Sequence, residues 1–386
     1  MKVAVSGVGL RSIKVLKYMK KAMPEIEYVG YFDPQPCLHS ELESDRDIPQ
    51  FDSIETMLAE SKPDLFFVGS PNHVHLDQIR MGLDAGVRVF AEKPVVSTLE
   101  QTWKIAELLK EYGSDQILVG LVLRYAPQMV DLRKALEAGQ LGDVVSLEAN
   151  EHIEPAHGAF FMRDWRRFVH YSGGFMVEKC VHDLDLYNMI TRSRPRKVAS
   201  FGGRRSFLCE NAPANNSDME ILHLKKSRWE SNDDPFNAEA DIIDHQTALI
   251  SYENGVSMTF HTNLNIPDQH RRFLVAGTKG TAEGDFQRGV MRVTASPSGK
   301  CLLDKDYSKG PDGLTDHYGA DAKMGRDLAA YLRKETDHLP VSVVDALEAG
   351  ICAMALDQAR ESGDMLDLTE LWQRFDSYKL RSSAVT

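Results

Sequence analysis

The first third of the chain alternates short apolar runs with amphipathic stretches of helical length. The apolar runs predict strands at residues 3–5, 28–32, 65–68, 87–91 and 117–122. The amphipathic stretches predict helices at residues 13–23, 54–60, 75–85 and 99–112. Strands that alternate with helices in this way form parallel sheets covered on both faces. The pattern therefore predicts an α/β domain with a doubly wound parallel sheet of about six strands.

The pattern changes after Arg124. A predicted helix at residues 128–138 is followed by strand-like runs that arrive without intervening helices, at residues 144–149, 197–202, 247–252, 256–261, 272–276 and 290–294. Asn254 and Gly255 stand between two of these runs, and Asn-Gly is the strongest short-range signal for a hairpin. We therefore expect an α+β domain with a large, mostly antiparallel open sheet.

These patterns divide the chain into two predicted domains, residues 1–124 and residues 125–386. Two helices are expected to close the chain, at residues 320–333 and 343–361, and to pack back on the first domain. The polar segment 209–241 is expected to form a long excursion on the surface, either mobile or ordered by a partner subunit.

Composition narrows the classes of function. The chain has 45 basic and 57 acidic residues and a formal net charge of −12, whereas duplex nucleic acid requires a clustered positive surface. The densest basic stretches, residues 192–197 and 225–228, are short and are expected to be solvated. No apolar run reaches the ~18 residues of a membrane helix, and Gly7 interrupts any signal-peptide core. Because the five cysteines form no CxxC pair, we expect a cytoplasmic protein without a metal site.

A glycine-containing loop joins the first predicted strand to the first predicted helix. Glycines in this position allow a tight turn and let a pyrophosphate approach the positive end of the helix. Asp33 ends the second strand, 24 residues after the second glycine, close to the spacing of the acid that binds a ribose 2′-hydroxyl. We interpret the loop as a dinucleotide site that prefers NAD over NADP; the alternative is an ordinary turn and a capping aspartate. The candidate cofactor residues here are Gly7, Gly9, Leu10, Arg11, Ser12 and Asp33.

Two further polar segments follow predicted parallel strands, at the sheet edge where ligands bind in such folds. The alternatives are a helix N-cap for Asn72 and a solvated side chain for Lys93. The candidate cofactor residues of these segments are Ser70, Asn72, His75, Glu92, Lys93 and Pro94.

The tripeptide Glu92-Lys93-Pro94 resembles the hallmark of the Gfo/Idh/MocA family, named for glucose-fructose oxidoreductase and inositol dehydrogenase. The resemblance covers nearly the whole chain, through residues 120–124, 165–166, 172–174, 182, 185, 277–280 and 340–346. It implies a Rossmann domain, an open-sheet domain, and NAD(P)-dependent redox chemistry on sugars, polyols or inositols. It also implies that Lys93 and His182 act together at the reacting carbon.

Glu178 stands where the family carries an aspartate four residues before the histidine. Glu178, His182 and Asp185 share one face of a predicted helix, and a carboxylate beside an imidazole favours the protonated ring and fixes its tautomer. Lys93, His182 and Glu178 are therefore the candidate catalytic residues. The alternative is that the carboxylates stabilise the helix dipole and that the histidine is a buried, paired group.

A dense polar and aromatic segment lies between the first strand of the second domain and Gly173. Tryptophan offers a flat apolar face and arginine a forked donor, and both suit sugar recognition. The alternatives are a core tryptophan, a structural ion pair, and a simple helix start at residues 317–321. The candidate substrate residues are Arg124, His157, Arg163, Trp165, Arg166, Lys179, Asp185 and His317.

The leading hypothesis is a dehydrogenase that passes hydride between a secondary alcohol of a sugar, sugar derivative or inositol and NAD. One alternative is an enzyme that uses tightly bound NAD for elimination, epimerisation or glycoside cleavage without net redox. Another is an NAD-binding sensor or regulator without turnover. The expected assembly is a homodimer or homotetramer formed through the second sheet, with no nucleic acid or membrane partner.

Overall fold

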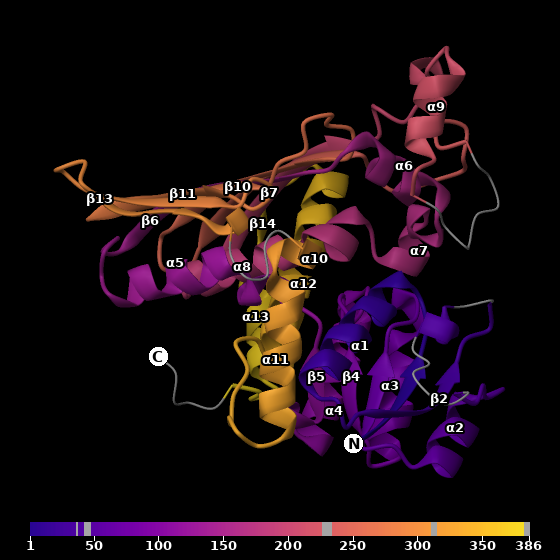
Figure 1. The fold of residues 1–386 in the computed structure, drawn as a ribbon. Coiled ribbons are helices and arrows are strands. Elements are labelled where there is room, and N and C mark those ends of the chain that lie inside the picture. The colour runs from indigo at the N-terminus through magenta and orange to yellow at the C-terminus, as the bar shows by residue number, and fades with distance from the viewer. Residues whose placement is uncertain (36–37, 42–47, 226–233, 310–314, 382–386) are drawn as a thin grey trace.

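The computed structural model describes residues 1–35, 38–41, 48–225, 234–309 and 315–381 (Figure 1). Its N-terminal part contains a five-stranded parallel sheet in the order β2-β1-β3-β4-β5. The strands are β1 (Lys2–Ser6), β2 (Glu27–Phe32), β3 (Leu65–Val68), β4 (Arg88–Ala91) and β5 (Ile117–Val119). The expectation of about six strands was wrong, because the chain turns into a 3-10 helix, Val122–Tyr125, directly after β5.

Helices alternate with these strands, as the sequence pattern predicted. They are α1 (Leu10–Ala22), α2 (Ile54–Ser61), α3 (His75–Asp84) and α4 (Leu99–Tyr112). Ser53 and Thr98 cap α2 and α4 by accepting backbone N–H groups of the first turns. All four residues of β3 are buried, as expected for a central parallel strand with both faces covered.

The C-terminal part is built on a nine-stranded sheet in the order β13-β12-β11-β10-β6-β9-β8-β7-β14. Within this sheet, β6 and β9 are the only described strands that pair in parallel. Its other described pairs are antiparallel, as predicted. The strands are β6 (Val144–His152), β7 (Pro195–Gly203), β8 (His245–Tyr252), β9 (Ser257–Asn263), β10 (Arg272–Gly277), β11 (Gly280–Asp285), β12 (Val290–Ala295), β13 (Cys301–Asp306) and β14 (Leu366–Asp367). The predicted hairpin at Asn254-Gly255 joins β8 to β9.

Helices cover one face of this sheet and leave the other face open (Figure 1). The covering helices include α5 (Pro127–Glu137), α8 (Val181–Thr191) and α12 (Val343–Ser362). Shorter helices lie toward the first domain or extend from the sheet end above it, namely α6 (Pro155–Arg163), α7 (Val169–Ser172), α9 (Asn216–Leu222) and α10 (Thr315–Tyr318). Within the described residues, no helix is both long enough and apolar enough to cross a bilayer.

The last helices return to the first domain. α11 (Ala320–Leu332) packs along α1, and α12 contacts α4 and β5. The prediction of two closing helices was incomplete, because α13 (Thr369–Asp376) follows them.

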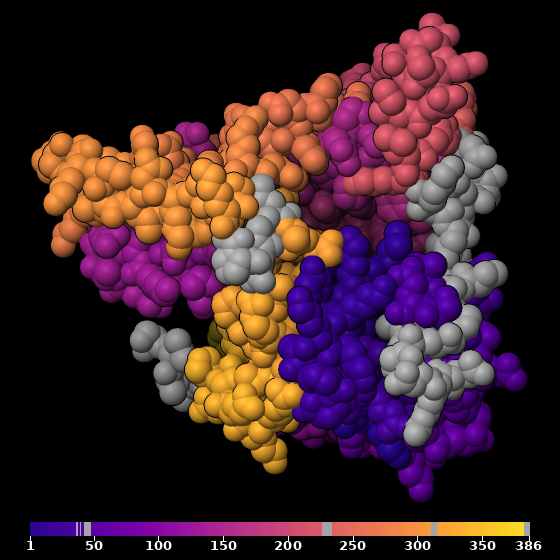
Figure 2. All heavy atoms as spheres, viewed as in Figure 1, coloured from indigo at the N-terminus to yellow at the C-terminus, as the bar shows by residue number. Residues whose placement is uncertain are grey.

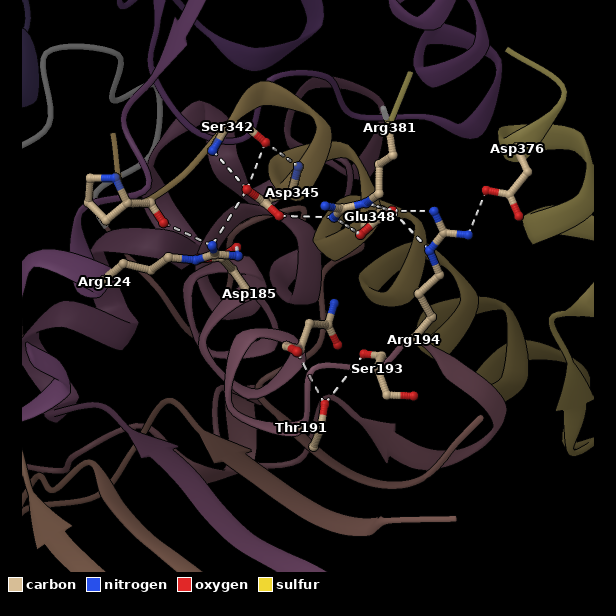
Figure 3. Close-up of polar contacts among 12 residues, drawn as sticks. Arg124, Asp185, Thr191, Ser193, Arg194, Ser342, Asp345, Glu348, Asp376 and Arg381 are labelled. Carbon is tan, nitrogen blue, oxygen red and sulfur yellow. Dashed lines mark hydrogen bonds and ion pairs between the residues drawn. The ribbon is translucent and has the colours of Figure 1, made fainter. Parts of the chain in front are cut away.

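A buried network of charges ties the C-terminal segment to α8 (Figure 3). Arg124 donates two hydrogen bonds to Asp185 of α8, at 2.8 and 2.6 Å, and one of its nitrogens lies 3.5 Å from Asp345 of α12. Asp345 also pairs with Arg381, and Arg381 and Arg194 share Glu348. Each of these cations has at least two polar partners, so the network holds α8 against α12 and the C-terminal segment.

The described part of the polar excursion projects from the end of the large sheet (Figure 2). Hydrogen bonds within the chain hold its two ends. Asp244 accepts the backbone N–H groups of Arg205, Ser206 and Phe207 at 2.6–3.0 Å. Arg163 of α6 donates to the carbonyl oxygens of Leu222 and Lys225. Residues 226–233, which include most of the basic stretch 225–228, lie outside the described part.

Three histidines meet on the open face of the sheet, at the end of β6. The ring of His152 lies 4.7 Å from those of His261 and His270. Burial and the two neighbouring rings lower the pKa of His152 to about 4, and Glu151 offsets this only in part. Among the described residues no group of side chains is arranged to hold a metal ion. Burial also lowers the pKa of His261, so the neutral imidazole is favoured at both His152 and His261.

This cluster predicts a loss of stability in acid. His152 takes up its proton near pH 6.5 in the unfolded chain but near pH 4 in the folded chain, so the free energy of unfolding falls as the pH drops through that interval. We expect His152→Gln to remove about 1–3 kcal/mol of this loss between pH 6.5 and 4, as measured by urea unfolding. His338→Gln, at a side chain that is 83% exposed, serves as the control and should leave the slope unchanged.

Candidate active site

The loop between β1 and α1 leaves the start of the helix open. Gly7 has a φ of +81°, and a Cβ there would lie 2.4 Å from the backbone nitrogen of Ser70. Gly9 precedes the first helical residue, and a Cβ there would meet nothing within 4 Å. No side chain caps the first turn of α1 and no acidic residue lies in it. The uncapped N–H groups therefore face open space, the arrangement that binds an anion.

The residues around the loop fix its shape. Ser12 is buried and donates a hydrogen bond of 2.6 Å to the carbonyl of Gly7, so this small residue packs against the loop. Asp33 follows β2, and its carboxylate accepts the N–H groups of Val8 and Gln35 at 2.8 and 3.0 Å. Leu10 is 62% exposed at the start of α1.

Arg11 connects the loop to the second domain. It donates to Glu92 at 3.0 Å and to Asp321 of α11 at 2.6 Å. His317 shares Asp321 with it at 2.7 Å, and burial followed by the Arg11 charge lowers the pKa of His317 to about 4. Two residues predicted for different ligands, Arg11 and His317, therefore lie together.

The segment after β3 is held between the two domains. His75 lies between the carbonyl oxygens of Pro94 and Ser70, at 2.9 and 2.8 Å, and the Ser70 hydroxyl donates to Gln78. The amide of Asn72 donates to the carbonyl of Ser172 at 2.8 Å and to the Glu178 carboxylate at 2.6 Å. Asn72 thus links the first domain to the candidate catalytic segment.

Lys93 and Glu178 meet at the centre of the site. The Lys93 ammonium donates to the main-chain carbonyl of Glu178 and lies 3.7 Å from its carboxylate. Arg166 donates to the same carboxylate at 2.7 Å. Burial opposes ionisation of Glu178, but Lys93, Arg166 and the Asn72 amide outweigh it and lower the pKa of the carboxyl. Burial also lowers the pKa of Lys93, partly against the attraction of Glu178.

His182 is buried at the start of α8 with its Nδ1 without a hydrogen-bond partner among the described residues. Burial, and then the charge of Lys93 and the neighbouring His317, holds its pKa well below the ordinary value. The lowered pKa favours the neutral ring, and no described hydrogen bond or ion pair joins Glu178 to His182 to favour the protonated one. Residues Met176–Cys180 form a turn of π-helix, so the α-helical spacing that was to bring Glu178 beside His182 does not apply.

Four of the candidate substrate residues lie near this centre. Arg166 stacks on the Trp165 ring at 4.3 Å and bonds Asp164 as well as Glu178. His157 packs against Phe161. Burial lowers the pKa of its imidazole, and the charges of Lys179 and Arg166 lower it further. Lys179 lies 3.3 Å from Glu151.

Other candidate substrate residues have structural partners instead. Arg124 and Asp185 form the buried pair of Figure 3, and Arg163 is fully buried against the excursion. The structure brings none of these three into contact with Lys93 among the described interactions.

A buried ion cluster near the site was not predicted from the sequence. Arg271 pairs with Asp183 at 2.6 Å and with Glu151 at 2.8 Å, and all three side chains are at most 3% exposed. Arg271 lies between His270 and Arg272, a setting typical of a solvated strand end. Asp183 lies in the first turn of α8, where an acidic residue is also typical of a favourable helix dipole, so its position did not indicate a buried ion pair.

The fold and this site define an oxidoreductase class with a Rossmann NAD-binding domain. The family model described as "Oxidoreductase family, NAD-binding Rossmann fold" matches residues 1–120, and the model for the GFO/IDH/MocA C-terminal domain matches residues 129–283. The chain belongs to the Gfo/Idh/MocA family.

Curated relatives are distant. The chain is 24% identical over 276 residues to the Bacillus subtilis protein YteT, covering 62% of this chain and 64% of that protein. It is 23% identical over 249 residues to the inositol 2-dehydrogenase of Corynebacterium glutamicum, covering 64% of this chain and 60% of that protein. These alignments thus span less than two thirds of either relative.

Solved structures share the fold over nearly the whole chain. A levoglucosan dehydrogenase in complex with NADH and levoglucosan aligns with a TM-score of 0.75 at 13% identity, over 96% of this chain and 99% of that one. The scyllo-inositol dehydrogenase of Lactobacillus casei with NAD(H) and scyllo-inositol aligns with a TM-score of 0.71 at 18% identity, over 95% and 99%.

Proposed function

We propose that the chain is an NAD(P)-dependent dehydrogenase that oxidises a secondary alcohol of a sugar, a sugar derivative or an inositol. The observation that carries the proposal is the meeting of Lys93 from the first domain with Glu178 and His182 from the second. A cation and a neutral imidazole in one buried site are the groups that alcohol oxidation needs. Relatives named as inositol dehydrogenases support the substrate class.

The glycine loop supports the cofactor. The open space at Gly9 and the uncapped turn of α1 fit a pyrophosphate, and Asp33 stands at the end of β2 where a ribose is bound in such folds. When bound, the nicotinamide accepts a hydride from the carbon that carries the hydroxyl. Arg11 is paired with Glu92 and Asp321, which favours NAD over a cofactor with an additional phosphate.

Three side chains divide the remaining work. His182 accepts the hydroxyl proton, since its lowered pKa leaves the ring neutral and able to act as a base. Lys93 stabilises the negative charge that grows on the oxygen. Glu178 acts as a positioning residue, because its carboxylate is held by Arg166 and Asn72 while it orients the Lys93 ammonium.

Nicotinamide absorbance tests the reaction directly. Purified protein is mixed with NAD or NADP and a panel of inositols, hexoses, uronates and their keto forms. Steady reduction of NAD by a panel member is the expected result. Product formation without net change in the cofactor would replace the dehydrogenase by an internal-redox enzyme, and binding without conversion would replace it by a sensor.

Gly9→Ala tests the cofactor site without disturbing the fold. The added methyl meets no protein atom within 4 Å, so we expect the melting temperature to stay within a few degrees of the native value. It occupies the space assigned to the pyrophosphate, and we expect the affinity for NAD to fall about tenfold in titration calorimetry. The matched control is Gly350→Ala, because Gly350 lies inside α12 and a Cβ there would lie 3.8 Å from Met354 Cε. This variant should bind NAD normally. An unchanged affinity of Gly9→Ala for NAD would contradict the assignment of the pyrophosphate to this loop.

We also propose that two copies pair through the open face of the large sheet. Phe201 and Leu249 lie on adjacent strands of that face and are 68% and 52% exposed. Exposed apolar residues on an uncovered sheet are typical of a subunit interface. Analytical ultracentrifugation should give a dimer or tetramer, and Leu249→Glu should shift it toward the monomer.

A further inference from the structure

The Arg166 guanidinium lies over the Phe160 ring of α6, and Lys225 pairs with Glu154 just before that helix. Four basic side chains from four different segments have the largest charge effects on His157 of the same helix. They are Lys93 after β4, Arg166 after α6, Lys179 in the π-helical turn and Lys225 in the excursion. His157 itself is only partly covered and packs on Phe161, with ring centroids 5.3 Å apart. The excursion therefore contributes a cation to the same space as the catalytic lysine.

Each of these cations has at least one carboxylate partner; Lys93 and Arg166 share Glu178, and Lys179 shares Glu151 with Arg271. Lys225 lies 2.9 Å from Glu154, which precedes α6, and Lys179 lies 3.3 Å from Glu151. Arg166 uses Nε for Glu178 and Nη1 for Asp164. Among the described residues its Nη2 has no hydrogen-bond partner, and the side chain is 25% exposed.

The largest charge effects on the two imidazoles of the site come mainly from cations. The strongest charge effects on His157 come from the four cations, and those on His182 come from Lys93, His317, Arg271 and Lys179. Both histidines have lowered pKa values, with burial as the first cause and these positive groups as the next. The side of the site next to these two rings is thus electropositive, although the cations and the carboxylates there are equal in number.

We propose that the substrate of this site carries a carboxylate, as an acidic sugar does, and that Lys225, Lys179 and Arg166 bind it. This inference rests on the dehydrogenase function proposed above. A guanidinium edge and two ammonium groups match the geometry of a carboxylate. Since every cation already has a carboxylate partner, the wall suits a single negative charge better than a phosphate dianion.

The proposal also gives the excursion a role. Arg163 donates to the carbonyl of Lys225 at 2.9 Å and to that of Leu222 at 3.3 Å, which fixes the backbone on which Lys225 is carried. Arg163 therefore acts on the substrate site through Lys225 and not by contact. The excursion serves as a selectivity element of the active site.

Binding measurements separate this inference from the proposed reaction. We use calorimetry in saturating NADH with three matched ligands, namely a hexose, the corresponding uronate and the hexose 6-phosphate. The uronate should bind about 10- to 100-fold more tightly than the hexose, the size expected for hydrogen bonds to a charged group. Lys225→Met should remove most of this preference without weakening hexose binding, and Lys225→Arg should restore it.

Lys305→Met is the matched control. Lys305 also pairs with one carboxylate, Asp131 at 2.7 Å, but lies on β13 away from the site. Equal affinity for hexose and uronate, a stronger preference for the phosphate, or a uronate preference that survives Lys225→Met would each overturn the inference. Turnover of any panel member would leave the dehydrogenase proposal standing in those cases, so the two failures are distinguishable.

Discussion

Lys93→Met should lower kcat/KM by about 10²- to 10⁴-fold, the range for loss of a group that stabilises charge or moves a proton in the transition state. The methionine keeps most of the side-chain volume and removes only the ammonium. Glu178 remains paired with Arg166 and Asn72, so the fold should persist. Steady-state kinetics with the best panel substrate measures the loss, and calorimetry should find NAD affinity unchanged within about threefold.

Lys104→Met is the control for this variant. Lys104 pairs with Glu100 on the exposed face of α4 at 2.9 Å and touches no site residue, so its removal should leave kcat/KM intact. Activity of Lys93→Met within tenfold of the native enzyme would reject Lys93 as a catalytic residue.

Arg271→Met should cost about 3–5 kcal/mol of unfolding free energy, the amount for breaking a buried ion pair on one side. It would leave Asp183 and Glu151 without their guanidinium partner, and Asp183 is 0% exposed. Burial already raises the pKa of Asp183 to about 6 against the attraction of Arg271. Urea unfolding at pH 7.5 measures the loss, which should shrink in acid as the Asp183 carboxyl takes up its proton.

Arg292→Met provides the contrast on the same sheet. Arg292 and Asp304 pair across β12 and β13 with both side chains more than half exposed, and such a pair contributes less than about 1 kcal/mol. Similar losses for the two variants would mean that water reaches the Arg271 cluster.

The sequence predicted the fold class and the approximate number of strands, because the periodicity of apolar residues indicates which positions are buried. β3 and β8 have the continuous and alternating patterns of a central and a one-sided strand, and both were predicted. β13 was missed because it lies at the sheet edge with most of its side chains exposed, so no apolar pattern marks it. β14 has two residues and is defined by its partner β7 alone.

The site was less predictable because its electrostatics are set by residues distant in sequence. The segment near Glu178 suggested a histidine paired with a carboxylate, yet the charge that most affects His182 belongs to Lys93. The π-helical turn at residues 176–180 has no signature in apolar spacing. Lys225 could not be placed near His157 before the path of the excursion was known.

The contacts between the domains constrain how this molecule can open. Arg11 bonds Asp321 on one side of the site, Asn72 bonds Ser172 on the other, and Lys93 bonds Glu178 between them. A hinge motion that parts the two halves must break hydrogen bonds and an ion pair, all at least partly buried, at several points at once. We therefore expect ligands to exchange through small local movements at the edge of the contact between the domains, and not through a rigid-body opening of whole domains.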